Sequence, residues 1–337
     1  MKDVSITKKQ LKIKNISYGT AVLGNYYEVL SNDEASQVIN KAFDLGINYF
    51  DTAPLYGFGL SEHRVGMNLQ LKDRDSYILS TKVGRLLSPA DPKEIDRGPW
   101  KGGLNFNPYY DYSYDGTMRC IEESMHRLGI SKIDILHIHD VDYFTHKEKH
   151  LVEKYFSEAI KGAYKALEEL RRNDNISAIS VGINEFEMAE RFLKEVDVDC
   201  VMLAGRYTLL EQNAINEFLP LCQEKQVSVV IGGPYNSGIL ASDLSKSVTY
   251  DYLPAPEHLI DKAKAIKLIC NEHSVDIKAA ALQFPLAHSS VVSVIPGVTS
   301  IDQVNENITM LKTDIPNSLW EHLKATELIH PDAPTPN

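Results

Sequence analysis

Residues 31–57 read SNDEASQVINKAFDLGINYFDTAPLYG, and this stretch decides the fold because it holds one complete helix-to-strand unit. Ser31 and Glu34 have the spacing of a capping box, and Gly46 is placed to end the helix. The apolar run 47–50 that follows predicts a short buried strand. Between cap and stop, apolar side chains recur at the i, i+3, i+4 and i+7 positions of an amphipathic helix, at Ala35, Val38, Ile39 and Ala42.

The same alternation continues along the chain. Helical periodicity recurs over 118–128, 160–167 and 189–196, and each segment is followed within a few residues by an apolar run. Such runs, apolar on both faces, are typical of parallel strands covered by helices, and eight are found, at 16–20, 49–52, 77–81, 133–138, 176–182, 200–203, 227–231 and 291–295. Eight strands alternating with helices predict one α/β domain over 1–337, a (β/α)8 TIM barrel, which leaves no sheet edge.

An open, doubly wound sheet is the alternative architecture. It would carry G-x-G-x-x-G between its first strand and helix, where residues 19–24 read GTAVLG. The near match over residues 57–62, GFGLSE, has Glu62 at the third glycine position. The dinucleotide fingerprint is therefore absent, which favours the barrel.

Composition and charge argue against several classes of partner. The chain of 337 residues is 43% hydrophobic and 24% charged, enough for a sizeable core. Its 35 basic and 46 acidic side chains give a net charge of -11, which repels nucleic acid and anionic membranes. No run reaches the ~20 apolar residues that span a bilayer, and residues 1–15 lack a signal-peptide core. Four cysteines without C-x-x-C spacing favour free thiols and a cytoplasmic location.

Two segments, 84–114 and 232–256, follow predicted strands and are too long to be simple connections. The first holds four prolines, Trp100 and five further aromatic residues, which predicts a stiff aromatic wall over a small polar ligand. A self-packed Ω-loop is the alternative. Residues 331–337, with three prolines, predict a short disordered tail.

Four polar residues, Asp51, Tyr56, Lys82 and His139, stand at or just beyond predicted strand ends. In a barrel of this kind the chemistry is assembled at the carboxyl ends of the strands, so the four are expected to meet. A tyrosine, with an ordinary pKa of about 10, accepts protons poorly unless a nearby cation such as Lys82 favours the phenolate. Asp51 could keep that cation charged, and His139 could orient a reacting oxygen from a neutral ring.

Three motifs carry a family resemblance: GINYFDTAPLYG over residues 46–57, STKVG over 80–84 and IHD over 138–140 resemble the aldo-keto reductases. The resemblance covers nearly the whole chain. It implies a (β/α)8 fold, a nicotinamide cofactor across the barrel mouth, and a catalytic tetrad that maps onto Asp51, Tyr56, Lys82 and His139. In that family the tyrosine is the acid/base.

The resemblance also implies a set of cofactor-binding residues. Ser180 and Asn184 resemble the carboxamide site, and Tyr207 resembles the aromatic that stacks on the nicotinamide. The pyrophosphate loop is carried over to the run 232–238, with Gly233, Pro234, Tyr235, Asn236 and Gly238. The adenosine end is carried over to Pro296, Gly297, Val298, Thr299, Gln303, Glu306 and Asn307.

Departures at the adenosine end bear on the cofactor. Many NADP-using members have Lys then Ser after the proline and Arg before the Glu-Asn pair, where this chain has Gly297, Val298 and Gln303. A 2'-phosphate needs cationic, preferably bidentate partners, so NAD is expected over NADP.

The segments WKGGL over 100–104, DYSYDG over 111–116 and HDVD over 139–142 resemble one subgroup, the NAD-dependent D-threo-aldose (L-fucose) 1-dehydrogenases and pyridoxal 4-dehydrogenases. Their substrates are cyclic hemiacetals that are oxidised to lactones. The expected function is therefore NAD-dependent oxidation of an aldose such as L-fucose or D-arabinose, or of pyridoxal, with Tyr56 as acid/base. An NADPH-dependent aldehyde or ketone reductase and a nicotinamide-binding regulatory subunit without turnover are the alternatives.

Several residues have a second interpretation. Trp100, Asp140 and Arg206 are candidate substrate contacts, but solvation or helix capping would also explain Asp140, and Arg206 could instead support a neighbouring loop. His137 and His139 lie on one strand face without a third ligand suitably spaced, so no metal site is expected.

Overall fold

Eight parallel strands form a nearly closed barrel in the computed structural model, which describes residues 1–244, 248–251 and 253–336. The sheet order is β14-β11-β10-β9-β8-β5-β4-β3, and bridges from Ile16 to Val294 and from Gly19 to Gly297 join its two edges. This confirms the predicted (β/α)8 fold. The strands are β3 (Tyr18–Gly19), β4 (Tyr49–Asp51), β5 (Ile78–Val83), β8 (Ile135–His139), β9 (Ala178–Ile183), β10 (Cys200–Ala204), β11 (Ser228–Gly232) and β14 (Val291–Ile295).

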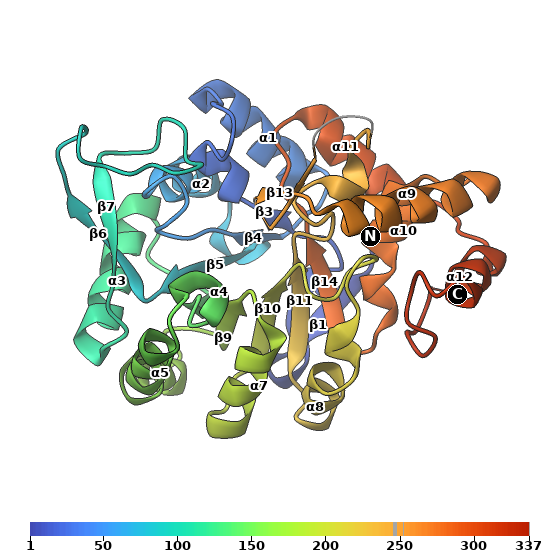
Figure 1. Ribbon diagram of the computed structural model, residues 1–337. Helices are drawn as coiled ribbons and strands as arrows, with labels where there is room; N and C mark the ends of the chain where they lie inside the picture. Colours follow the sequence, from blue (N-terminus) through green and yellow to red (C-terminus); the bar gives the residue numbers. More distant parts are fainter. Residues whose placement is uncertain (245–247, 252, 337) are drawn as a thin grey trace.

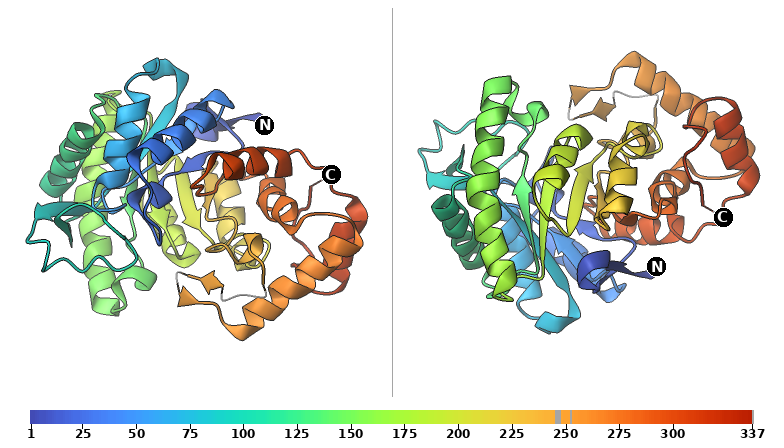
Figure 2. Two further views of the ribbon diagram at one scale, coloured as in Figure 1. Left: turned by 90° about the horizontal axis from the view of Figure 1, so that it is seen from above. Right: turned by 90° about the horizontal axis from the view of Figure 1, so that it is seen from below.

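Helices surround the strands on the outside, as Figures 1 and 2 show from the side, from above and from below. They are α1 (Asn32–Asp44), α2 (Leu60–Leu69), α3 (Tyr114–Leu128), α4 (Tyr143–His146), α5 (Lys149–Glu158), α6 (Tyr164–Arg172), α7 (Phe186–Glu195), α8 (Phe218–Glu224), α9 (Glu257–Glu272), α10 (Ile277–Gln283), α11 (Ile301–Met310) and α12 (Asn317–Ala325). Short 3-10 turns are η1 (Thr7–Lys9), η2 (Ala21–Gly24), η3 (Arg74–Ser76), η5 (Asn213–Ile215), η6 (Ile239–Ala241) and η7 (Pro285–Ala287), and η4 (Ala159–Ala163) is a π-helical turn.

The helix used to predict the fold begins and ends for the expected reasons. Ser31 Oγ accepts the backbone N–H of Glu34 at 3.2 Å, and Glu34 Oε2 accepts that of Ser31 at 2.8 Å, which completes the capping box. Gly46, just after the helix, has a φ of 87°, a left-handed conformation that glycine adopts without a Cβ penalty. No described helix is long and apolar enough to cross a membrane.

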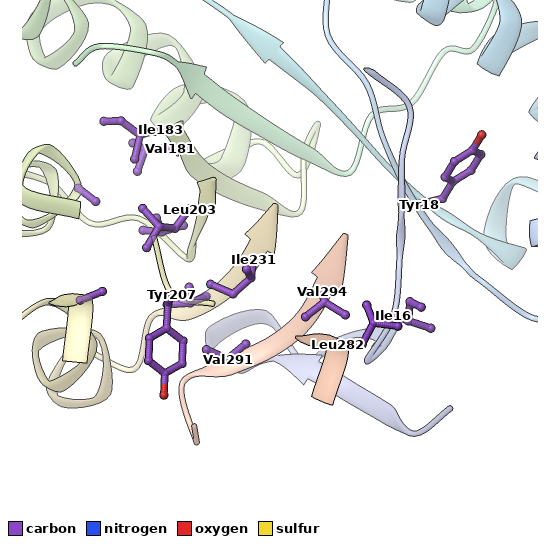
Figure 3. Packing of buried hydrophobic residues seen from close by; sticks show 14 of the residues in the cluster. Ile16, Tyr18, Val181, Ile183, Leu203, Tyr207, Ile231, Leu282, Val291 and Val294 are labelled. Carbon is purple, nitrogen blue, oxygen red and sulfur yellow. The ribbon is translucent and has the colours of Figure 1, made fainter. Parts of the chain in front are cut away.

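The strand pleat divides the core into two clusters. Outward side chains pack under the helices, and Figure 3 shows Val181, Leu203, Ile231 and Val294 doing so on four neighbouring strands. Inward side chains fill the lower barrel, where Ile135, Ala178, Cys200 and Met202 meet the N-terminal hairpin of β1 (Asp3–Ile6) and β2 (Leu11–Lys14). Ile6 and Ile13 of that hairpin are fully buried, so it closes the bottom of the barrel.

The two long segments contain more structure than the sequence indicates. Within 84–114, β6 (Arg85–Pro89) and β7 (Phe106–Tyr110) form an antiparallel hairpin, at the left of Figure 1. Within 232–256, β12 (Thr249–Tyr250) pairs with β13 (Leu253–Pro254), and residues 245–247 and 252 lie outside the described part of the chain.

The prediction of a disordered tail over 331–337 is wrong for the described residues 331–336. Ala333 is fully buried in the main core cluster, and its N–H donates to the carbonyl of His330 at 3.1 Å. Burial removes the apolar surface of this alanine from water. The free energy gained in this way exceeds the preference of the surrounding prolines for an extended, solvated chain. Residue 337 lies outside the described residues.

Candidate active site

A pocket of about 770 Å³ opens at the carboxyl ends of the barrel strands. Asp51, Tyr56, Lys82 and His139 all line it, as expected from their positions at strand ends. The described residues include no group of three or more His, Cys, Asp or Glu side chains placed to hold a metal ion.

An ion pair lies at the floor of the pocket. Lys82 Nζ donates to Asp51 Oδ2 at 2.5 Å and to the carbonyl of Thr52 at 2.8 Å, and both side chains of the ion pair are at most 3% exposed. Ser80 Oγ donates to the other carboxylate oxygen of Asp51 at 2.6 Å. Burial raises the pKa of Asp51, and this effect exceeds the lowering caused by the charge of Lys82 and by the hydrogen bonds from Lys82 and Ser80. The geometry gives each partner a charge-assisted hydrogen bond in a site from which water is excluded.

Tyr56 lies beside this pair on the loop after β4. Lys82 Nζ sits 4.9 Å from the centre of the Tyr56 ring, and the His139 ring stands perpendicular to it at 6.2 Å. Burial, followed by the charges of Asp51 and Asp140, holds the pKa of Tyr56 well above its ordinary value. The expected lowering of this pKa by Lys82 is therefore not found. Asp51, 2.5 Å from the ammonium, largely offsets its positive charge.

The loop that carries Tyr56 is held by a close crossing of two backbones. A Cβ built on Gly24 would lie 2.5 Å from the backbone N of Gly57 and from the carbonyl carbon of Tyr56. On the other side, Leu104 N–H donates to the Gly57 carbonyl at 3.0 Å. Only glycine at position 24 allows this approach, so the position of Tyr56 depends on it.

His139 ends β8 with its ring in the pocket and its own carbonyl accepting a 2.6 Å hydrogen bond from the Tyr112 hydroxyl. Burial, with the positive charges of Arg85 and Lys82, holds the pKa of His139 well below its ordinary value. The ring is therefore neutral at physiological pH, as expected for a group that donates one hydrogen bond to a reacting oxygen.

A ring of polar side chains lies below the pocket floor. His137 Nε2 is 3.5 Å from Asp51 Oδ1 and 3.4 Å from the Tyr49 hydroxyl, and that hydroxyl lies 3.0 Å from Ser80 Oγ. Burial lowers the pKa of His137 well below its ordinary value, so this histidine is a neutral interior residue that supports Asp51.

The structure brings together most of the residues predicted to bind the cofactor. The pocket is lined by the following of them: Asn184, Gly233, Pro234, Tyr235, Asn236, Gly238, Pro296, Gly297, Val298, Thr299, Gln303, Glu306 and Asn307. Gly233 and Gly238 have positive φ and open space around a built Cβ, which leaves their backbone accessible to a ligand. Asn236 Oδ1 is buried without a hydrogen-bond partner among the described residues. A glycine-rich wall with an unused polar atom fits an extended dinucleotide.

Three predicted site residues lie elsewhere. Ser180 is buried inside β9, one pleat below Gly182, which does line the pocket. Tyr207 is fully buried and packs on Phe284 at 5.5 Å, within the hydrophobic cluster drawn in Figure 3. Arg206 forms a two-pronged ion pair with Asp251, at 2.9 and 2.7 Å, and so supports a pocket loop instead of facing the pocket.

Sequence reasoning missed two charged residues of the pocket. Arg85 comes from the β6–β7 hairpin and forms an ion pair with Asp140 at 2.6 Å. Lys278 comes from α10 and forms an ion pair with Glu306. Arg85 stands directly after the STKVG motif, and this position is the one signal that could have identified it. Trp100, Tyr110 and Phe144 are among the aromatic residues that line the pocket, and the first two come from the segment 84–114, which agrees in part with the predicted aromatic wall.

The fold and this arrangement of charged and aromatic groups define an oxidoreductase of the aldo-keto reductase class. The chain belongs to the aldo/keto reductase family, whose model matches residues 15–327. Members of this family use nicotinamide cofactors.

Two curated relatives match almost the whole chain. It is 40% identical to a pyridoxal 4-dehydrogenase of Microbacterium luteolum over 330 residues, 95% of each protein. It is 39% identical to a D-threo-aldose 1-dehydrogenase of a Pseudomonas species, over 97% of this chain and 96% of the relative. Among solved structures, the holo form of an aldo-keto reductase from Bacillus halodurans superposes with a TM-score of 0.75 at 25% identity, over 97% of this chain and 96% of that one.

Proposed function

We propose that this protein is an NAD-dependent dehydrogenase that oxidises a cyclic hemiacetal to the lactone. The substrate class is an aldose such as L-fucose or D-arabinose, or pyridoxal. The observation that carries the proposal is the convergence of Tyr56, His139 and the buried Asp51–Lys82 pair at the pocket floor. The names of the two relatives at 39 and 40% identity support the substrate class. The four free cysteines, all buried, suit a cytoplasmic enzyme.

In the proposed mechanism Tyr56, as the phenolate, accepts the proton of the hemiacetal hydroxyl and becomes the neutral phenol. His139, neutral in this site, donates a hydrogen bond to the same oxygen and orients it. Lys82 stabilises negative charge that develops on the Tyr56 ring, over whose face its ammonium lies at 4.9 Å. When bound, the nicotinamide would accept the hydride that leaves the carbon bearing the hemiacetal hydroxyl.

Charge at the far end of the pocket supports NAD over NADP. Lys278, which could contact a 2'-phosphate, is instead paired with the Glu306 carboxylate. Gln303 is neutral, and its side-chain oxygen accepts the N–H of Thr299 at 2.8 Å. A carboxylate is suited to accept hydrogen bonds from ribose hydroxyls and repels a phosphate dianion.

A substrate panel tests the proposal directly. L-fucose, D-arabinose, L-galactose and pyridoxal would be supplied with NAD or NADP, and the reduced cofactor followed by absorbance. We expect turnover of at least one hemiacetal with a higher kcat/KM for NAD. A tenfold preference for NADP would contradict the proposed function and favour a reductase, and so would the absence of oxidation combined with reduction of an open-chain aldehyde supplied with NADPH. Cofactor binding with no turnover of any substrate would favour the regulatory subunit.

A matched pair of variants tests the role of the tyrosine. Tyr56→Phe removes only the hydroxyl and is expected to lower kcat by at least ~10²-fold, with little change in NAD affinity. Tyr143→Phe, at an exposed tyrosine that does not line the pocket, is the control and should leave kcat unchanged. Survival of kcat in Tyr56→Phe would refute the mechanism.

A further inference from the structure

Asp140 has an unusual position next to His139. Its φ of 51° is left-handed, a conformation that costs energy for a residue with a side chain and that clusters at functional sites. The backbone is held there by a hydrogen bond from Asp140 N–H to the Gly182 carbonyl at 2.8 Å. As a result the Asp140 carboxylate lines the pocket, and one of its oxygens lies 3.3 Å from His139 Nε2.

Two further residues fix the carboxylate of Asp140. Arg85 Nη2 donates to Oδ2 at 2.6 Å, and Asn184 Nδ2 donates to Oδ1 at 2.9 Å. The side chains of Arg85 and Asp140 are only 11 and 14% exposed, yet both line the pocket. A charged pair held this firmly in a largely desolvated place is preorganised for a polar ligand group.

Asp142, two residues further on, has a different role. Its Oδ1 accepts the N–H of Thr145 at 2.9 Å and so caps α4, and its Oδ2 accepts the N–H of Asn184 at 2.8 Å. It is fully buried and does not line the pocket. The chain therefore offers two neighbouring carboxylates, of which the partly buried Asp140 lines the pocket and the fully buried Asp142 supports the structure.

The remaining hydrogen-bond capacity of the Arg85–Asp140 pair indicates its ligand. An ionised carboxylate accepts about four hydrogen bonds, and Asp140 receives two from the side chains of described residues. The Arg85 guanidinium donates one hydrogen bond among the described residues, and Asp140 accepts it. The other N–H groups of the guanidinium therefore remain as donors next to the unused acceptor positions of the carboxylate. A hydroxyl group, which both donates and accepts, is complementary to such a pair.

We propose that Asp140, held by Arg85 and Asn184, determines specificity by accepting a hydrogen bond from the substrate hydroxyl on the carbon next to the reacting carbon. Asp140 Oδ2 and His139 Nε2 lie 3.3 Å apart, about one hydrogen-bond length. This separation is similar to that between the oxygens on two adjacent carbons of a sugar, so each group can bind one of those oxygens. This inference rests on the proposed function and deepens it. The substrate is then a hydroxylated hemiacetal of the aldose class, and pyridoxal, whose reacting carbon adjoins an aromatic ring carbon, lacks the recognised group.

The test compares an aldose with its 2-deoxy analogue, in wild-type protein, Asp140→Asn and Asp142→Asn, by kcat/KM with NAD. Wild-type protein is expected to prefer the hydroxylated sugar, and Asp140→Asn to reduce that preference by ~10- to 100-fold, because a hydrogen bond to a charged acceptor is lost. Asp142→Asn changes a more deeply buried carboxylate that does not line the pocket, and it should keep the wild-type preference even if its melting temperature falls.

Folding is followed by circular dichroism and by NAD affinity, so that a misfolded variant is recognised. If Asp140→Asn does not fold, Arg85→Lys replaces it, and the preference is expected to fall by ~5- to 10-fold, since the planar guanidinium fork no longer orients the carboxylate. An unchanged preference in the folded variant, or no preference in wild-type protein, overturns the inference. Failure of the proposed function is a different result, in which wild-type protein turns over no hemiacetal at all.

Discussion

Substituting Gly24 with alanine tests whether the backbone crossing beneath Tyr56 positions the catalytic loop. The added methyl would lie 2.5 Å from the backbone of residues 56 and 57, whereas ordinary contact begins at 3.4 Å, so the loop must move by about 0.9 Å. Gly24 does not have a positive φ, so alanine adds no backbone strain of its own. A shift of that size at a reacting group is expected to lower kcat by ~10- to 100-fold. Overpacking should also cost about 1–3 kcal/mol of stability.

The assay is steady-state formation of reduced cofactor with the preferred hemiacetal, alongside thermal unfolding and NAD affinity. Gly98→Ala is the control, because its methyl meets no atom within 4 Å, although its φ of 46° makes alanine strained. The control should lose about 1 kcal/mol of stability and keep its kcat. A Gly24→Ala protein that is folded and has wild-type kcat would show that the crossing does not position Tyr56.

Three further predictions concern buried charge and protons. Lys82→Met leaves the Asp51 carboxylate buried without its partner and should cost ~3–5 kcal/mol in chemical denaturation; a loss below ~1 kcal/mol would contradict the ion pair. The pKa of His137 is lowered in the folded protein, so below pH ~6.5 the unfolded chain binds a proton that the folded chain does not. As the pH is lowered below ~6.5, the stability of wild-type protein should therefore decrease more steeply than that of His137→Gln. Parallel curves for the two proteins would refute this. Because the pKa of Tyr56 is raised, the oxidation rate should climb through the alkaline range, and a flat profile would exclude Tyr56 as the base.

The fold and the centre of the site were predictable because both depend on local periodicity. Each of the eight predicted strands has a counterpart within a few residues, since buried parallel strands are apolar runs and the intervening helices have clear stripes. The four residues of the tetrad meet because parallel strands end at the same rim.

Other features depend on three-dimensional details that periodicity does not contain. Ser180 lies on the same face of β9 as the pocket residue Gly182 but two positions earlier, which is enough to bury it below the pocket. Tyr207 is buried because of the direction in which the loop turns after β10. Arg85 follows the STKVG motif, but its side chain reaches the pocket from a hairpin that the sequence does not predict, and Lys278 reaches the pocket from a helix that follows no such motif. The burial of Ala333 depends on long-range packing that composition alone does not reveal.

The N-terminal hairpin has a consequence for access to the pocket. Ile6 and Ile13 are buried at the base of the barrel, which closes that end, and the described pocket opens at the opposite end. Under the proposed function, the sugar and the nicotinamide nucleotide therefore enter and leave through the same mouth of the barrel.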